Sequence, residues 1–172
     1  MTIKLYDRDS HTSQFIGTVL ACEAKGKHYE ILLDQTAFFP GGGGQEADSG
    51  RLGETPVRAL REENGNIYHE LDLPFPVGSE LAGEIDWEAR FARMQNHSGE
   101  HIISGRVNAW FGYHNVGFHM SEQEMTLDFD GEFTDEEIGR IEIEANRIVT
   151  SNVAVNVAYP NAEELERLEY RS

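Results

Sequence analysis

The chain has 172 residues, of which 39% are hydrophobic and 10% aromatic, so it is long and apolar enough to build a packed core. Its 14 basic and 31 acidic residues give a formal net charge of −17, which argues against the broad basic surface typical of nucleic-acid-binding proteins. The sequence has neither a run of roughly 18 apolar residues nor a basic-then-apolar leader, so we expect no transmembrane helix, no signal peptide and no membrane partner. The single cysteine, Cys22, suits a reducing compartment, and we expect a cytoplasmic protein.

Short strands separated by turns are predicted throughout residues 1–85. The strand segments are residues 15–22, 29–34, 57–61, 67–71 and 81–85, and glycine, asparagine or proline marks the breaks between them. Strands at such regular spacing are typical of a small antiparallel β-barrel, which we predict as the first domain.

The character of the sequence changes at Asp86, a residue type that often caps a helix N-terminus. A helix is predicted over residues 87–111, with one face formed by Trp87, Phe91, Met94, Ser98, His101, Gly105 and Ala109. Strands are predicted over residues 117–121 and 125–129, where apolar and polar residues alternate in the second segment.

A second helix over residues 135–152 is indicated by a capping box at Thr134 and Glu137 and by an apolar stripe. The stripe consists of Ile138, Ile141, Ala145, Ile148 and Val149. Alternation then predicts a strand at Val153, Val155, Val157 and Tyr159, and a last acidic helix follows over residues 162–170. We therefore predict an α+β protein, in which residues 86–172 form a second α/β domain with an antiparallel sheet and flanking helices. Either the last helix packs back on this sheet or the native protein continues.

A locally basic face on this acidic chain would still serve an RNA partner. Arg90, Arg93 and Arg106 fall on the first predicted helix, and Arg58 and Arg61 precede it. The alternative is an acidic, solvated surface that serves solubility.

Two histidines, His97 and His101, lie four residues apart on the predicted helix, so both imidazoles project from one face. Neutral imidazole is a common metal ligand, and this spacing brings two ring nitrogens within reach of one Zn²⁺. The alternative is a pair of hydrogen-bonded histidines without a metal. The same string spells the H-x-x-E-H of inverzincin peptidases, with Glu100 as general base, but little chain follows it. We expect Glu100 to be a solvated helix residue.

Four consecutive glycines, residues 41–44, precede Gln45. Such a run costs backbone entropy and persists where side chains would obstruct a close approach. A backbone that passes a phosphate or ribose is one explanation, and an ordinary flexible hairpin loop is the other. No Lys-Ser or Lys-Thr follows the glycines, so this is not a Walker A loop.

Three segments, residues 33–50, 85–104 and 116–129, resemble in order and spacing the motifs of AlaX proteins and of the editing region of alanyl-tRNA synthetase. The resemblance implies a trans-editing hydrolase, an aminoacyl-tRNA deacylase that removes serine or glycine from mischarged alanine tRNA at a zinc site. A site that hydrogen-bonds the serine hydroxyl rejects alanine, which would leave that polar group unpaired.

On this resemblance His97 and His101 bind Zn²⁺, which either orients the amino acid or polarises water. Gln45 and Thr36 are the candidate catalytic residues. The candidate substrate-binding residues are Gly42, Gly43, Gly44, His119 and Ser121. Thr36, His119 and Ser121 are candidates for reading the substrate hydroxyl, and each has the alternative of being a structural polar group. We further expect both histidines to face the glycine-rich loop across one open cleft.

Two features depart from the family pattern. Gly41 stands where an acidic residue is usual, and the chain has no downstream Cys-x-x-x-His pair to complete the zinc ligands. The resemblance therefore implies either an N-terminal portion of a longer protein or a member that binds metal weakly or not at all. An inactive fragment that binds the tRNA acceptor end and an H-x-x-E-H peptidase remain as alternative functions.

Overall fold

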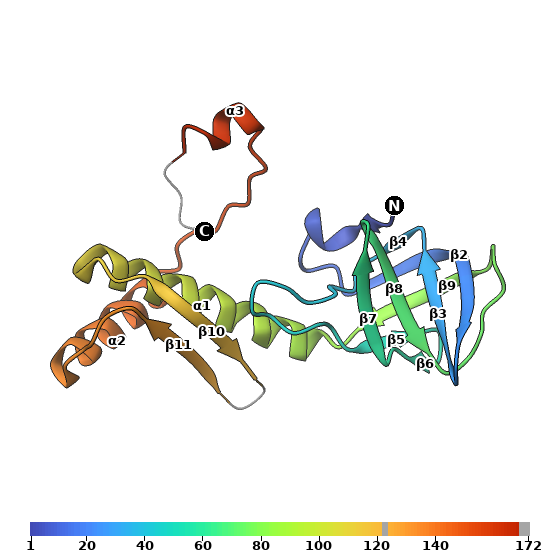
Figure 1. Ribbon diagram of the computed structural model, residues 1–172, viewed down its shortest axis with the longest axis horizontal. Helices are drawn as coiled ribbons and strands as arrows, with labels where there is room; N and C mark the ends of the chain where they lie inside the picture. Colours follow the sequence, from blue (N-terminus) through green and yellow to red (C-terminus); the bar gives the residue numbers. More distant parts are fainter. Residues whose placement is uncertain (122–123, 169–172) are drawn as a thin grey trace.

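The computed structural model describes residues 1–121 and 124–168. It is a mixed α/β structure with a curled antiparallel sheet at one end and, at the other, a hairpin packed with helices α1 and α2 (Figure 1). Helix α1 runs from the sheet to the hairpin (Figure 1). A short helix α3, Ala162–Leu165, lies near the end of the described chain.

The sheet has seven strands in the order β6-β5-β9-β2-β3-β8-β7, and all neighbours are antiparallel. Their bounds are Gln14–Lys25 for β2, His28–Leu33 for β3, Gly50–Leu52 for β5, Thr55–Pro56 for β6, Ala59–Glu63 for β7, Asn66–Leu71 for β8 and Glu80–Ile85 for β9. Each strand segment predicted for this half overlaps a strand of the sheet, although Val57 and Arg58 of the predicted strand 57–61 form a link between β6 and β7. A parallel pair, β1 (Ile3–Lys4) with β4 (Gln35–Thr36), and the 3₁₀ turn η1 (Leu5–Asp7) accompany it.

The two edge strands of the sheet are joined directly by the chain. Val57 and Arg58 link β6 to β7, and the amide of Val57 donates to the carbonyl of Gly50 in β5, the neighbour of β6, at 2.9 Å. The amide of Arg58 donates to the carbonyl of Glu70 in β8, the neighbour of β7, at 2.8 Å. The curl of the sheet thus brings its two edges together at these two residues.

The concave face of the curled sheet holds the hydrophobic core. Phe38 is fully buried, and its ring lies edge-on to Phe15 at 5.9 Å and to His69 at 5.5 Å between centroids. Buried side chains from five strands surround it, among them Val19, Ile31, Leu33, Leu52, Leu71, Leu81 and Ile85. Burial of each such side chain contributes roughly 1.5–3 kcal/mol, so this core is the main stabilising element of the sheet.

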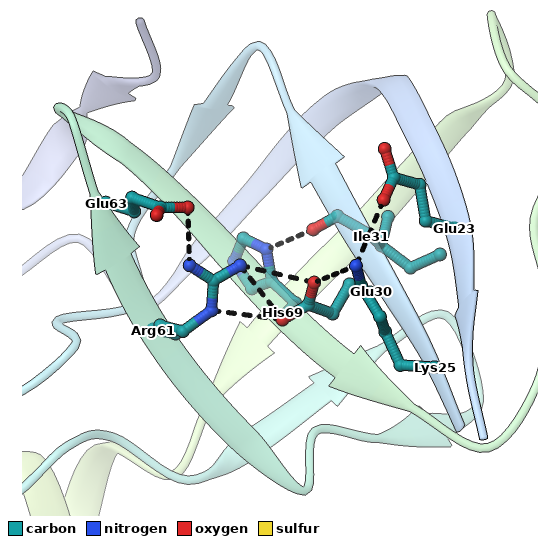
Figure 2. Close-up of polar contacts among 7 residues, drawn as sticks. All are labelled: Glu23, Lys25, Glu30, Ile31, Arg61, Glu63 and His69. Atoms are coloured by element: carbon teal, nitrogen blue, oxygen red, sulfur yellow. Dashed lines mark hydrogen bonds and ion pairs between the residues drawn. The ribbon is translucent and has the colours of Figure 1, made fainter. Parts of the chain in front are cut away.

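The outer face carries a ladder of ion pairs over three strands (Figure 2). The guanidinium of Arg61 lies between Glu30, at 3.0 Å, and Glu63, at 2.7 Å. Lys25 lies 3.7 Å from Glu30 and 3.3 Å from Glu23. Apart from Glu30, whose side chain is 16% exposed, these groups are about half exposed or more, so the ladder contributes to solubility and strand register more than to stability.

Helix α1 spans Trp87–Phe111 and begins at Asp86, whose carboxylate accepts a hydrogen bond from the amide of Ala89 at 3.1 Å. Its bounds and its cap confirm the prediction, but the face that the sequence pattern marks is not the buried one. The buried residues are Arg90, Glu100, Ser104 and Val107, whereas Ser98, His101, Gly105 and Ala109 are exposed. The helix contacts different partners along its length, and hydrogen bonds bury polar side chains there, so apolar spacing does not mark the buried side.

Strands β10 (Asn115–Met120) and β11 (Met125–Phe129) form the predicted antiparallel hairpin. Helix α2, Asp135–Thr150, follows, and the capping box of Thr134 and Glu137 is present. Of its predicted apolar stripe, Ile141 is buried, while Ile138 and Val149 are more than half exposed along an apolar groove between α1, β11 and α2.

The strand predicted from the alternating valines is absent from the described residues, so the second sheet has two strands there instead of three. Val153, Val155, Val157 and Tyr159 are between 60% and 81% exposed. A strand needs a neighbour for its backbone hydrogen bonds, and none pairs with this segment in the described part of the chain. The predicted last helix is short, and residues 169 and 170 of that prediction lie outside the described residues. None of the helices described is long and apolar enough to cross a membrane.

Candidate functional site

The two histidines of α1 lie on one face of the helix, as their spacing predicts. The rings of His97 and His101 are stacked, with centroids 5.0 Å apart and planes inclined by 22°. His97 is half-buried beside Phe118 of β10, at 5.7 Å between centroids, whereas the His101 side chain is 67% exposed. The ring of His97 therefore lies against the protein, and the ring of His101 faces solvent.

The Nδ1 atom of each imidazole is held by an oxygen. His97 Nδ1 lies 3.1 Å from Oε1 of Gln45, and His101 Nδ1 lies 2.9 Å from Oε2 of Glu100. An amide oxygen only accepts, so Nδ1 of His97 carries the hydrogen, and the lone pair of the neutral ring sits on Nε2, which is the arrangement that metal-binding histidines use. Nδ1 of His101 lies at ion-pair distance from a carboxylate, which favours a hydrogen on the same atom of that ring.

Glu100 is buried, with 4% of its surface exposed, so the expectation of a solvated helix residue is wrong. Its Oε1 accepts hydrogen bonds from the Ser104 hydroxyl and from Nδ2 of Asn115, the latter at 2.8 Å. Asn115 belongs to β10, which packs across α1 and covers the carboxylate. The sequence of α1 alone does not reveal this cover, because it comes from another element.

The environment of His97 lowers the pKa of its imidazole below the usual value. Burial is the largest cause, the charge of a protonated His101 is the second, and Glu100 acts in the opposite direction. Because a metal binds the neutral ring, a lowered pKa favours the metal-binding form of His97.

The glycine-rich loop forms a tight turn against α1. The amide of Gly42 donates to the carbonyl of Gln45 and the amide of Gln45 donates back to Gly42, both at 3.0 Å. Gly43 and Gly44 between them have φ of +58° and +81°, which is the signature of a type I′ turn. A Cβ at Gly44 would lie 2.1 Å from Cδ1 of Phe118, and one at Gly43 would lie 3.6 Å from Cε1 of His97. Gly44 thus permits close packing on β10, and Gly43 places the turn in contact with His97.

A buried ion pair fixes this loop to α1. Arg90 Nε donates to Oδ1 of Asp48 at 2.7 Å, and its Nη2 contacts Oδ2. Nη2 also donates to the carbonyl of Ala37 at 2.8 Å, while the amide of Phe39 donates to Asp48 at 2.7 Å. Both charged side chains are at most 3% exposed. Asp48 and Arg90 therefore determine where the turn sits over the helix.

This pairing corrects the hypothesis of a basic face for RNA. Arg90 is buried, and the remaining candidates are each opposed by an acid: Arg58 by Asp72, Arg61 by Glu30, Arg93 by Glu46 and Arg106 by Glu144. The five arginines do not form one exposed cluster of positive charge.

Loop, helix and hairpin together enclose a cavity of about 220 Å³. It is lined by Gly43, His97, Glu100, His101, His114, Asn115 and Phe118. The loop and the histidines thus meet in one cleft, as expected, with Gln45 bonded to His97 at its side. His114, Asn115 and Phe118 were not among the sequence candidates, because only the position of β10 across α1 brings them here.

Three other candidates lie elsewhere. Thr36 is fully buried in the sheet core, where its hydroxyl lies 2.9 Å from Nε2 of His69 and accepts from the amide of Phe38. His119 is exposed, and strand alternation directs it away from the face of Phe118. Ser121 lies at the end of β10 and bonds to the backbone of Glu124. None of the three lines the histidine cavity.

The donor set fits half of a zinc site. Two imidazoles on one helix face would supply two ligands to a tetrahedral ion, which takes four ligands or three and a water. Among residues 1–121 and 124–168, no group of three or more His, Cys, Asp or Glu side chains is placed to hold a metal. Further ligands would therefore have to be water, substrate or groups from outside this set.

Comparison with known proteins gives one consistent result, although no family model matches. The chain is 34% identical to the alanyl-tRNA editing protein AlaX-M of Saccharolobus solfataricus, over 95% of this chain and 71% of that protein. It is 29% identical to the alanyl-tRNA editing protein Aarsd1-B of Xenopus laevis, over 87% of this chain but 40% of the relative. A third relative is the alanine–tRNA ligase of Methanopyrus kandleri, with 36% identity over 80% of this chain and 16% of the ligase. The chain thus spans less than half the length of the latter two.

Proposed function

The chain belongs to the family of alanyl-tRNA editing proteins, and on this premise we propose that it hydrolyses the aminoacyl ester of mischarged alanine tRNA, releasing serine or glycine. The observation that carries the proposal is the cavity in which His97 and His101, with oriented Nε2 atoms, face the glycine turn. We place this activity in the cytoplasm, which agrees with the lone Cys22.

We also propose that residues 1–85 form a barrel domain and residues 86–172 an editing domain. Every strand of the seven-stranded sheet ends at or before Ile85, and α1 begins at Trp87. The two parts share the site, because the loop comes from the first and the histidine helix from the second.

The chemistry assigned to the site is attack of water on the ester carbonyl. Zinc held by Nε2 of His97 and His101 would supply positive charge for the carbonyl oxygen or for the water. Gln45 and Glu100 would orient the two rings for this role, and Gly43 and Phe118 line the cavity that would receive the small aminoacyl group.

Glu100 is better suited to positioning His101 than to acting as a peptidase base. Its Oε2 contacts His101, and its Oε1 already accepts from Ser104 and Asn115. A general base must reach the proton that it abstracts, with an oxygen directed at the water. This geometry supports the deacylase over the H-x-x-E-H peptidase.

The proposal is tested by incubating alanine tRNA charged with serine, glycine or alanine with the protein and zinc. We expect release of serine or glycine with little release of alanine. The His97→Ala variant should lose most of the rate because it removes one metal ligand, while His119→Ala, which changes an exposed histidine outside the cavity, should retain it. Equal release of all three amino acids, or an unaffected His97→Ala variant, would count against the proposal.

A second candidate function is a binding module, favoured by the presence of only two placed metal ligands in the described chain. Such a protein would bind the tRNA acceptor end without hydrolysing the ester. Acceptor-end binding without serine release, in saturating zinc, would select this function over the deacylase.

A further inference from the structure

A second pocket lies directly beside the histidine cavity. It has a volume of about 220 Å³ and is lined by Glu46 of the loop, by Ala89, Arg93 and Asn96 of α1, and by Met120 and Ser121 at the end of β10. Asn96 precedes His97 in the helix, and Met120 lies two residues beyond Phe118 in the strand. The two hollows therefore follow one another along the same helix and the same strand.

Arg93 gives this second pocket its chemical character. Its side chain is 15% exposed, and Nη2 lies 3.2 Å from Oε2 of Glu46. Its Nη1 is buried without a hydrogen-bond partner, and it is the one side-chain nitrogen or oxygen of which this holds among the described residues. A guanidinium nitrogen left without an acceptor inside a protein is costly, and such a group calls for a ligand that supplies one.

The position of Arg93 relative to the histidines suggests the ligand. Arg93 precedes His97 by one helical turn, so both lie on one face, roughly 6 Å apart along the axis. This is the length scale of one nucleotide in a single strand. A nucleotide whose ribose ester lies in the histidine cavity would place its own 5′-phosphate near Arg93. Guanidinium is the side chain that best recognises phosphate, through charge-assisted hydrogen bonds.

We propose that the Arg93 pocket binds the phosphate of the 3′-terminal nucleotide of the RNA substrate, an inference that rests on the proposed function. Glu46 then acts as the acceptor that occupies Arg93 in the absence of RNA, since its side chain is 49% exposed on the loop and bonds only one edge of the guanidinium. The other arginines of α1 are committed elsewhere, Arg90 to Asp48 and Arg106 to Glu144.

The test uses AMP, adenosine and inorganic phosphate as probes of the metal-free protein by isothermal titration calorimetry. We expect AMP to bind about tenfold more tightly than adenosine, the gain typical of a charge-assisted hydrogen bond, and more tightly than inorganic phosphate. Arg93→Gln should remove the preference for AMP. Glu46→Gln should strengthen AMP binding because it removes a competing carboxylate, and this opposite sign does not arise from misfolding.

The matched control is Arg106→Gln, which removes the same charge from the same helix away from the pocket and should leave the AMP preference unchanged. Equal affinity for AMP and adenosine, equal affinity for AMP and inorganic phosphate, or an equal effect of Arg106→Gln would overturn the inference. Because the probes contain no ester, failure here is distinguishable from failure of deacylation: serine release without an AMP preference refutes only the phosphate pocket. An AMP preference without serine release refutes only the hydrolase.

Discussion

Two residues from different parts of the chain decide how the histidine pair presents its nitrogens. Gln45 arrives on the loop and accepts a hydrogen bond from Nδ1 of His97, while Glu100, on the helix itself, lies at ion-pair distance from Nδ1 of His101. The buried Glu100 is held in turn by Ser104 and by Asn115 of β10. A change at Glu100 therefore tests whether the ring orientation matters for metal binding.

We expect Glu100→Gln to lower zinc affinity by about 10- to 100-fold, the usual cost of losing a partner that orients a metal ligand. A glutamine cannot replace both oxygens, because either His101 or the donors Ser104 and Asn115 would face its NH₂ group. Competition with a chromophoric chelator measures the change, and Glu88→Gln, an exposed acid on the same helix, is the control. Equal zinc affinity in the two variants would show that Glu100 does not position His101.

His69 offers a test by pH. Burial lowers the pKa of its imidazole to about 4, while a bond to the carbonyl of Ile31 at 3.2 Å acts weakly in the other direction (Figure 2). In the unfolded chain the histidine has a pKa near 6.5, so between about pH 6.5 and pH 4 its imidazole is protonated in the unfolded chain and neutral in the folded protein. This contribution to stability is thus complete above pH 6.5 and is lost as the pH falls toward 4, by about 3 kcal/mol.

Urea denaturation at pH 7 and pH 4.5 measures this loss. Titrating carboxylates also contribute, so the expected result is a difference between variants: His69→Gln should lose less stability on acidification than the native chain, while the exposed His119→Gln should behave as the native chain does. An unchanged pH dependence in His69→Gln would mean that the buried ring does not titrate as described.

At the scale of elements, the ion pair of Asp48 and Arg90 joins the glycine-rich loop to α1. Asp48→Asn would leave a buried guanidinium without its counter-charge, and we expect a loss of about 3–5 kcal/mol in the free energy of unfolding. Denaturant titration measures it. Glu84→Gln, which removes one of the two acids that pair with the exposed Arg51, should change stability little. If both variants are equally stable, the pair does not hold the loop.

The elements that were predicted correctly carry their signals locally. The start of α1 at Asp86, the capping box at Thr134 and the β10–β11 hairpin follow from residues a few positions apart. The errors involve partners distant in sequence. The valines 153, 155 and 157 alternate as a strand does, yet no described strand pairs with them. Glu100 is buried because Asn115 and β10 cover it, which no pattern within α1 reveals.

The sequence predicted the helix and the loop that form the candidate site, but not the residues of the hairpin that line the rest of the cavity. Spacing predicted that His97 and His101 share a face, and the glycine run predicted a close approach. Which face of α1 would be buried could not be predicted, since Arg90 and Glu100 are buried by specific ion pairs and hydrogen bonds rather than by apolar character.

At the scale of the whole molecule, the net charge of −17 limits how strongly the affinity for RNA depends on salt. With Arg93 as the single phosphate contact, few counterions are released, and we expect log affinity for a single-stranded acceptor end to fall with log salt with a slope no steeper than about −1. Fluorescence anisotropy at several salt concentrations measures the slope, and Arg93→Gln should bring it near zero. A slope of about −4 or steeper would require a basic surface that we have not identified.

The hydrogen bond from His97 to Gln45 makes the loop a partner in metal affinity. Thermodynamic linkage is reciprocal, so if an ordered loop favours the metal-binding ring, a bound metal must favour the ordered loop to the same extent. Zinc should then slow amide hydrogen exchange in residues 41–48, although the loop supplies no metal ligand. Conversely, substitutions in the sheet that loosen the loop should weaken metal binding. The zinc-binding constant of the histidines on α1 would then depend on how well residues 41–48, from the other half of the chain, are ordered.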